Sequence, residues 1–431
     1  MATPLSPVHR VWRYKVFAAT WLSYVGFYFC RKPFSAAKAA IGDETGWSAS
    51  TLANLWAAYL VAYSLGQFLA SAMGPKIGPR KNLLLGMGLS ILVTVVMGVE
   101  LDLRVFAGLA VVNGFAQATG WSGNVGTMAT WFHKHERGRV MGVWSTNFTV
   151  GSIVSGLVMS WVLDQHGKGE PAPWRWCFYT GAMVLGLVWV IFFLLQRNKP
   201  EDVGLPPIDD PVTPEDESQI PDPPPTGFLG FDRSQWSNLL LVGGFYFCAK
   251  FLRYAVWSWS AYFLKKNYAL DDAGANFYAI AFDLFGVPGV FLTGWVSDRY
   301  FASKRAEVAM IMIVGMVIST GLLTAYGDTS VTVFVILLAA VGFTLFGPDA
   351  LLSGAGAMDI GRRNLATRAT GIIAGFGAMG AVVQEVVIGR MYDQKHGELG
   401  PIFLLLFGGA ALAGVFCGVL VWRNRRNGNG I

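Results

Sequence analysis

The chain contains repeated stretches of apolar residues long enough to cross a lipid bilayer. Two examples are "NLLLGMGLSILVTVVMGV" (82–99) and "GAMVLGLVWVIFFLL" (181–195). A spanning helix needs about 20 mostly apolar residues, and only 14% of this chain is charged, against about 25% in soluble proteins. We therefore expect an all-α membrane protein with about twelve transmembrane helices. The spans are predicted to begin near Tyr14, Thr51, Asn82, Val105, Gly138, Trp174, Ser237, Ala275, Val308, Val331, Arg368 and Pro401.

Lysine and arginine gather in alternate connections between these predicted spans, which is typical of cytoplasmic loops. An even number of spans then places both termini in the cytoplasm, and no cleavable signal peptide is expected at the N-terminus. The net charge of +6 is thus explained by topology, and no nucleic-acid partner is expected. The basic residues concerned are Arg10/Arg13/Lys15, Lys76/Arg80/Lys81, Lys134/Arg137/Arg139, Arg197/Lys199/Arg233, Arg299/Lys304/Arg305, Arg362/Arg363/Arg368 and Arg423/Arg425/Arg426.

The sequence divides into two similar halves. The stretch "PEDVGLPPIDDPVTPEDESQIPDPPP" is rich in proline and acid, which predicts a flexible linker over 197–234. It separates two six-helix bundles, 1–196 and 235–431. Arg31 and Arg253 are 222 positions apart and the basic pairs that begin at Arg80 and Lys304 are 224 apart, by difference of residue numbers. Parallel repeats of this kind predict pseudo-symmetric bundles with a substrate site at their interface.

The first and seventh spans each carry cations inside an apolar segment. Arg31 and Lys32 interrupt "FYFCRKPFSA", Arg253 stands within "FLRYAVWSW", and Lys250 directly precedes it. A charge at mid-bilayer costs about 2.5–3.5 kcal/mol on insertion scales. The presence of these cations in apolar segments therefore needs an explanation. One interpretation is structural: the cations reach an interface, as Lys32 is placed to do, or pair with buried acids. The other is that two guanidinium groups, one per half, bind a divalent oxyanion such as phosphate.

Several motifs resemble the organophosphate:phosphate antiporters of the major facilitator superfamily over nearly the whole chain. They are "YFCRKPFS", "NGFAQATGW", "ERGRVMGVWS", "KPEDVGL", "FLRYAVWSW", "FDLFGVPG" and "GPDALLSG". The resemblance implies that fold, and exchange of an organic phosphate ester for inorganic phosphate by alternating access. It also implies that "GWVSDR" gates the cytoplasmic side through Asp298 and Arg299. The residues implied in substrate binding are Arg31, Arg253, Lys250, Tyr28, Tyr63, Gln67, Trp121, Trp144 and Asn147.

Departures from the family pattern bear on the substrate. Phe148 stands where glycerol-phosphate members carry a histidine, and Gln67 stands where they carry a lysine. Lys250 resembles a lysine of the eukaryotic sugar-phosphate exchangers. These differences favour a sugar phosphate such as glucose 6-phosphate, or a phosphoglycerate, over glycerol 3-phosphate.

The acids Asp283 and Glu385 are predicted to lie within spans. The resemblance implies that Asp283 pairs near the basic residues of the seventh span, whereas Glu385 is open to pairing with Arg390 or Lys250 or to proton transfer. A proton-coupled symporter using either acid therefore remains an alternative. A transporter-like receptor for a sugar phosphate is another.

No enzyme, cofactor or metal is expected. The four cysteines lack metal-ligand spacing, and no nucleotide-binding Gly-x-x-x-x-Gly-Lys-Ser/Thr loop occurs. We expect a monomer in a bacterial inner membrane, whose partners are the lipid bilayer, a phosphate ester and inorganic phosphate.

Overall fold

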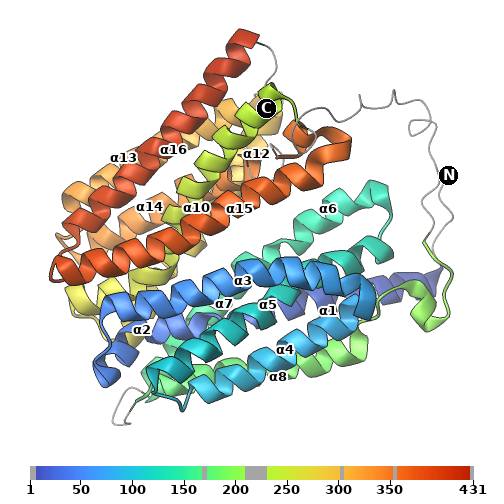
Figure 1. Cartoon of the computed structure of the whole chain (residues 1–431), viewed down its shortest axis with the longest axis horizontal. Coiled ribbons are helices and arrows are strands. Elements are labelled where there is room, and N and C mark those ends of the chain that lie inside the picture. Colours follow the sequence, from blue (N-terminus) through green and yellow to red (C-terminus); the bar gives the residue numbers. More distant parts are fainter. Residues whose placement is uncertain (1–5, 167–171, 209–230, 301–304, 353–356, 428–431) are drawn as a thin grey trace. The chain divides into compact units, whose positions relative to one another are not determined.

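The computed structural model describes residues 6–166, 172–208, 231–300, 305–352 and 357–427. The regular elements in these ranges are helices, shown with their labels in Figure 1. The first half contains α1 (Pro7–Phe29), α2 (Lys32–Thr45), α3 (Ala49–Ile77), α4 (Pro79–Met97), α5 (Leu103–Trp131), α6 (Lys134–Trp144), α7 (Thr146–His166), α8 (Arg175–Leu195) and the 3₁₀-helix η1 (Pro200–Val203). The second half contains α10 (Arg233–Tyr268), α11 (Asp272–Ala279), α12 (Ala281–Tyr300), α13 (Arg305–Tyr326), α14 (Val331–Ala350), α15 (Ala357–Gln394) and α16 (Gly400–Asn427).

Nine helical stretches within the described ranges are long and apolar enough to cross a membrane. Two of them join consecutive helices, α6 with α7 and α11 with α12. The long helices α1, α3 and α5 bring the number to the predicted twelve. α5 has 29 residues but carries Asn113, Gln117 and Asn124, all of which are buried. The polar side chains that lower the mean hydropathy of α5 are thus buried inside the protein.

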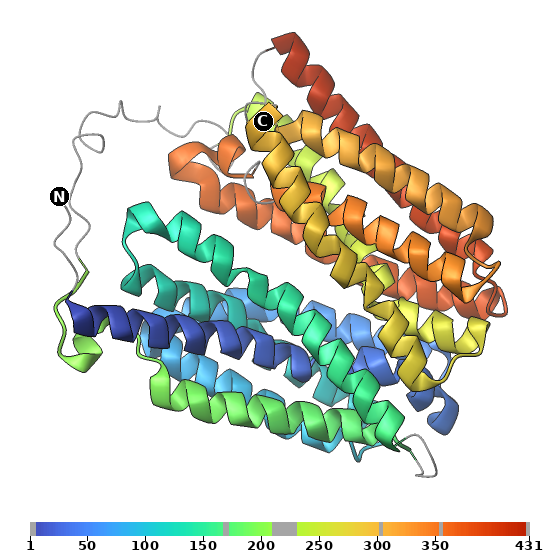
Figure 2. The same ribbon diagram turned by 180° about the vertical axis from the view of Figure 1, so that it is seen from behind.

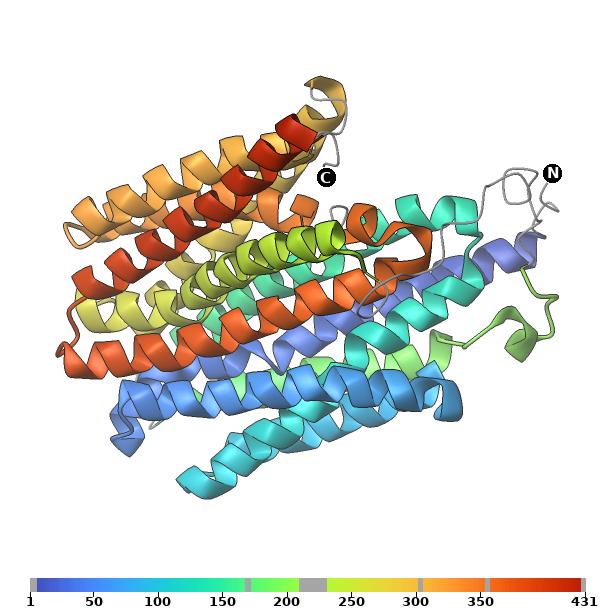
Figure 3. The ribbon, with the colours of Figure 1, turned by 45° about the horizontal axis from the view of Figure 1, so that its top comes forward.

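The chain forms two compact units, Met1–Thr45 with Ala58–Ile220, and Gly46–Ala57 with Pro221–Ile431. The helix pairs that pack within unit 1 correspond to those within unit 2. In unit 1 α1 packs on α7 and α8, and α4 packs on α5 and α8. In unit 2 α10 packs on α15 and α16, and α13 packs on α14 and α16. Figure 3 shows α10 beside α15, and Figure 2 shows the units from behind. This correspondence of neighbours is what two parallel repeats predict.

The first span is broken where Arg31 stands. α1 ends at Phe29 and α2 begins at Lys32. Pro33 has no backbone N–H to offer the carbonyl four residues earlier, that of Phe29. The amide groups of Cys30 and Arg31 bond instead to Phe27 and Tyr28, three residues back. Arg253, in contrast, lies within α10, which continues unbroken for 36 residues.

α12 and α14 approach each other closely at two glycines. A Cβ atom on Gly289 would lie 2.0 Å from the carbonyl oxygen of Phe343, and one on Gly342 would lie 2.2 Å from that of Phe282. Any side chain at either position would therefore clash with backbone. This contact fixes α14, whose last turn carries Asp349, against α12.

The start of the predicted linker is attached to unit 1. The side-chain carbonyl of Asn198 accepts a hydrogen bond from the amide of Arg80 (2.8 Å), and its backbone carbonyl accepts one from Thr130 (2.5 Å). The indole of Trp131 donates to the carbonyl of Arg197 (3.0 Å), and the ring of His9 bonds to Pro206 (3.1 Å). The prediction of a flexible linker therefore does not describe its first ten residues; its central part, 209–230, lies outside the described residues.

The beginning of α3 is held by an acid of unit 2. The carboxylate of Asp393, at the end of α15, accepts hydrogen bonds from the amides of Ala49 (3.1 Å) and Ser50 (2.8 Å). Gly389, one turn earlier, faces Ala53, and Trp56 stacks on Trp257 with ring centroids 6.0 Å apart. Asp393 thus acts as an N-cap supplied by another helix.

We predict that Asp393→Ala lowers the thermal stability of the purified protein, because two amide groups at the start of α3 lose their acceptor. Loss of an N-cap costs about 1 kcal/mol. The midpoint of thermal unfolding in detergent measures this loss. Glu398→Ala is the matched control, since Glu398 is an exposed carboxylate five residues further on. Equal midpoints for the two variants would contradict the capping role.

Candidate functional site

Arg31 is buried among polar and aromatic side chains of unit 1. The residue is 8% exposed, and its Nε donates to the side-chain oxygen of Gln117 on α5 (3.0 Å). The guanidinium carbon lies 4.9 Å from the ring centre of Tyr28 and 4.8 Å from that of Tyr63. The terminal nitrogen Nη2 is buried and has no hydrogen-bond partner among the described residues. Such an orphaned donor of a buried cation marks a place where an anion would be stabilised.

A chain of buried polar groups supports Gln117. Its side-chain oxygen also accepts from the hydroxyl of Tyr59 (2.9 Å), and its Nε2 lies 3.3 Å from Ser90 Oγ and from Asn113 Oδ1. Ser90 donates to Asn113 (2.7 Å), which donates in turn to the carbonyl of Cys30 (3.2 Å). The network therefore returns to the residue before Arg31 and satisfies a carbonyl exposed by the helix break.

Aromatic side chains continue from Arg31 along unit 1. Tyr24 lies between Tyr28 (6.1 Å between ring centres) and Trp121 (5.5 Å), and Trp121 lies 5.4 Å from Trp144. Trp144 is fully buried and donates to Thr20 (3.2 Å), whereas Trp121 is 37% exposed. The predicted residues Tyr28, Tyr63, Trp121 and Trp144 thus belong to one cluster with Arg31, and Trp121 is its most exposed member.

Asn147 and Gln67 are the remaining polar residues predicted for unit 1. Asn147 is fully buried near the start of α7, and neither atom of its side-chain amide has a hydrogen-bond partner among the described residues. One turn further along α7, Gly151 faces Tyr28. Gln67 is half-buried on α3, one turn after Tyr63. Among the residues of this unit predicted to bind substrate, Arg31 and Asn147 are therefore the two with buried polar atoms that lack a hydrogen-bond partner among the described residues.

In unit 2 the two predicted cations share one carboxylate. Asp349, on α14, accepts from Arg253 Nη1 (2.6 Å) and from Lys250 Nζ (3.3 Å) through the same oxygen. The guanidinium of Arg253 also lies 4.2 Å from the ring centre of Phe346, and the Lys250 amine lies 4.8 Å from that of Tyr246. These three charged groups together carry one formal positive charge.

The acids predicted from the sequence, Asp283 and Glu385, are both buried. Asp283 lies in the first turn of α12, and the acid bonded to both Lys250 and Arg253 is Asp349. Glu385 is fully buried and accepts from Ser258 (3.1 Å) and from the neighbouring Gln384 (2.9 Å). Arg299 is exposed near the end of α12, and the side chain of Asp298 lies outside the described residues.

Gln117 and Asp349, which bond to Arg31 and Arg253, were not predicted from the sequence. Both stand inside motifs that it used, "NGFAQATGW" and "GPDALLSG". The feature of the sequence that could have identified them is the presence of a polar residue within an apolar span. In each unit the arginine of the first span is bonded to a polar residue of the fourth span, neutral Gln117 in unit 1 and charged Asp349 in unit 2.

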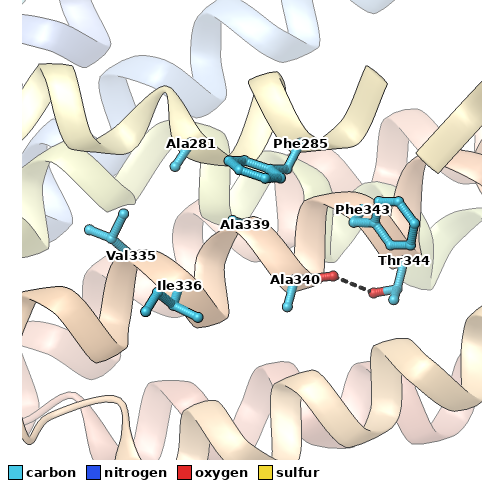
Figure 4. A pocket seen from close by; sticks show the side chains of 8 residues that line it. All are labelled: Ala281, Phe285, Val335, Ile336, Ala339, Ala340, Phe343 and Thr344. Carbon is cyan, nitrogen blue, oxygen red and sulfur yellow. Dashed lines mark hydrogen bonds between the residues drawn. The ribbon is translucent and has the colours of Figure 1, made fainter. Parts of the chain in front are cut away.

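An apolar groove on unit 2 lies between α12 and α14 (Figure 4). Its volume is about 380 Å³, and the hydroxyl of Thr344 is bonded to the carbonyl of Ala340 (2.8 Å). The groove offers no group to bind an oxyanion and suits a hydrocarbon chain instead. Its lining residues are Ala281, Phe285, Val335, Ile336, Ala339, Ala340, Phe343 and Thr344.

Comparison with known proteins identifies the family of this chain and several of its relatives. The sequence profile described as "Major Facilitator Superfamily" matches residues 16–385. The glycerol-3-phosphate transporter of Bacillus subtilis is 26% identical over 428 residues, covering 95% of this chain and 92% of that protein. Sugar phosphate exchanger 3 of Mus musculus is 27% identical over 456 residues, covering 91% and 89%. The crystal structure of a D-xylose-proton symporter is similar in fold, with a TM-score of 0.71, 13% identity and coverage of 94% and 97%.

Proposed function

Because the chain belongs to the major facilitator superfamily, a superfamily of multi-pass membrane transporters, we propose that it exchanges an organic phosphate ester for inorganic phosphate. The observation that carries this proposal is the buried guanidinium of Arg31 with an unpartnered Nη2. An oxyanion is the ligand that such a group stabilises best. Relatives named for glycerol 3-phosphate and sugar phosphates support the same class of substrate.

The charges of the two units are suited to a doubly negative ligand. Arg31 carries a full positive charge and is bonded to a neutral amide. Lys250, Arg253 and Asp349 contribute a second formal positive charge. A phosphate monoester carries about −1.5 to −2 charges at neutral pH. We propose that both arginines bind the same phosphate group, as the parallel repeats predict.

This balance of charge gives a reason for obligatory exchange. Without a ligand, the uncompensated cations repel each other whenever the halves close, and this repulsion raises the free energy of the closed form. A bound phosphate removes this repulsion, so that the loaded carrier changes its facing more readily than the empty one. Asp349 reduces the electrostatic repulsion but does not abolish it, because its single negative charge offsets the charge of only one of the two cations that it contacts.

The organic part of the substrate is proposed to meet the aromatic cluster and Asn147. Sugar rings present apolar faces that pack on aromatic side chains, and their hydroxyl groups bond to amides. The exposed surface of Trp121 and the unpartnered amide of Asn147 supply these two features. A sugar phosphate is therefore the substrate that we propose, transported in a bacterial inner membrane by a monomer with cytoplasmic termini.

A second candidate function is proton-coupled symport, favoured by the full burial of Glu385. A buried carboxylate is a common proton carrier in transporters. The two functions differ in their driving force. A symporter would accumulate its substrate with a pH gradient and would not respond to phosphate on the opposite side. The proposed exchanger would require phosphate on the opposite side and would not respond to a pH gradient.

Exchange is tested with the purified protein in vesicles loaded with labelled inorganic phosphate. We expect label to leave only when inorganic phosphate or a phosphate ester is present outside, and most rapidly with the preferred ester. A protonophore should leave this release unchanged. Release of label into a buffer free of phosphate, at the same rate, would contradict obligatory exchange.

We predict that Arg31→Lys reduces phosphate exchange about ten-fold or more. Lysine keeps the positive charge but lacks the planar fork that binds two phosphate oxygens at once, and a charge-assisted hydrogen bond contributes about 1.5–3 kcal/mol. Initial exchange rates in vesicles measure the effect. Arg104→Lys is the control, because Arg104 is exposed at the start of α5. Full activity of Arg31→Lys would show that a point charge is sufficient.

We predict that Asp349→Asn strengthens phosphate binding and slows exchange. The substitution removes the carboxylate that Lys250 and Arg253 share, so phosphate becomes their available counter-charge. Phosphate should then raise the unfolding temperature of the variant by more than it raises that of the unmodified protein. The matched control is Asp272→Asn, which removes a carboxylate paired with Lys265. An unchanged response to phosphate in Asp349→Asn would contradict competition between the carboxylate and the substrate.

A further inference from the structure

The bond between Arg31 and Gln117 uses one particular nitrogen of the guanidinium group. Gln117 accepts from Nε (3.0 Å), while Nη2 has no partner among the described residues. A guanidinium can grip an oxyanion through Nε and Nη2, or end-on through Nη1 and Nη2. Since Nε is already engaged, the end-on edge is the one left for a ligand.

The orientation of the Gln117 amide is itself fixed. Its Nε2 is within hydrogen-bond distance of oxygen atoms of Ser90 and Asn113, which makes the other atom, Oε1, the one that faces Arg31 and Tyr59. Gln117 is 1% exposed, so water does not compete for these bonds. A rotated amide would place a donor against the Arg31 Nε donor, which is unfavourable.

We propose that Gln117 is a positioning residue that presents the end-on edge of Arg31 to the substrate phosphate while leaving its charge uncompensated. This inference rests on the proposed function. A carboxylate in the same place would hold Nε equally well but would neutralise the guanidinium, as Asp349 partly does for Arg253. The neutral amide is therefore the feature that makes Arg31 the stronger anion-binding group of the two arginines.

Two substitutions separate the positioning role from the charge. Gln117→Glu keeps the shape and the acceptor and adds a negative charge beside Arg31. Gln117→Met keeps the approximate length but removes the acceptor, which frees the guanidinium to rotate. We expect the KM for inorganic phosphate to rise about ten-fold or more in Gln117→Glu and by a smaller factor in Gln117→Met. The maximal exchange rate should change less than KM in both, because the residue acts on binding through Arg31.

The matched control is Asn124→Asp. Asn124 lies on the same helix, is fully buried and bonds to Ser23 (2.9 Å), so this variant adds the same charge without touching Arg31. Its KM for phosphate should remain within about two-fold of the unmodified value. An equal loss in Asn124→Asp and Gln117→Glu would point to a general effect of charge in α5 and overturn the positioning role.

Binding is also measured directly, as the rise in unfolding temperature that inorganic phosphate produces in detergent. If the unmodified protein shows neither this rise nor phosphate exchange, the proposed function fails. If the unmodified protein binds phosphate and Gln117→Glu binds it as tightly, the proposed function stands and the role of Gln117 is overturned. Should Gln117→Glu fail to fold, an unchanged KM in Gln117→Met would overturn it as well.

Discussion

A guanidinium group buried in a bundle of apolar helices is the constraint from which the organisation of unit 1 follows. An isolated charge at mid-bilayer is unfavourable by several kcal/mol, so Arg31 requires neighbours that stabilise it. The structure provides an amide oxygen and two tyrosine rings. It also provides the break after Phe29, which places Arg31 in a turn between two helices. Two of the polar residues that lower the apolar character of α5, Asn113 and Gln117, belong to the hydrogen-bond network that stabilises this arrangement.

The two units stabilise a buried arginine with different side chains. Each bonds the arginine of its first span to the fourth span, but Gln117 is neutral and Asp349 is charged. Without Asp349, the three cations Arg31, Lys250 and Arg253 would give the empty carrier three formal positive charges instead of two. Sharing Asp349 between Lys250 and Arg253 moderates that excess. The proposed exchange then depends mainly on Arg31, whose charge no described carboxylate contacts.

The sequence predicts the architecture well because its signals are local. Apolar length predicts the twelve spans, and the spacing of Arg31 and Arg253 predicts the repeats. The partners of these arginines could not be predicted, since a pattern along one helix does not say which face of another helix it meets. The acid that contacts both Lys250 and Arg253 is an example: Asp349 stands on α14, which packs against α12 at Gly289 and Gly342. The linker was misjudged near Asn198 for the same reason: its bonds are to distant residues.

The separation between a fixed charged part and a more adaptable aromatic part bears on substrate range. Arg31 is held by a network of directed hydrogen bonds that tolerate little displacement. The aromatic cluster beyond it, in contrast, is held by ring contacts of 5–6 Å, and Trp121 keeps an accessible surface. Aromatic faces accept ligands of varied outline, whereas buried charged groups discriminate sharply. Under the proposed function, we therefore expect the identity of the ester to depend on residues such as Asn147 rather than on the arginines.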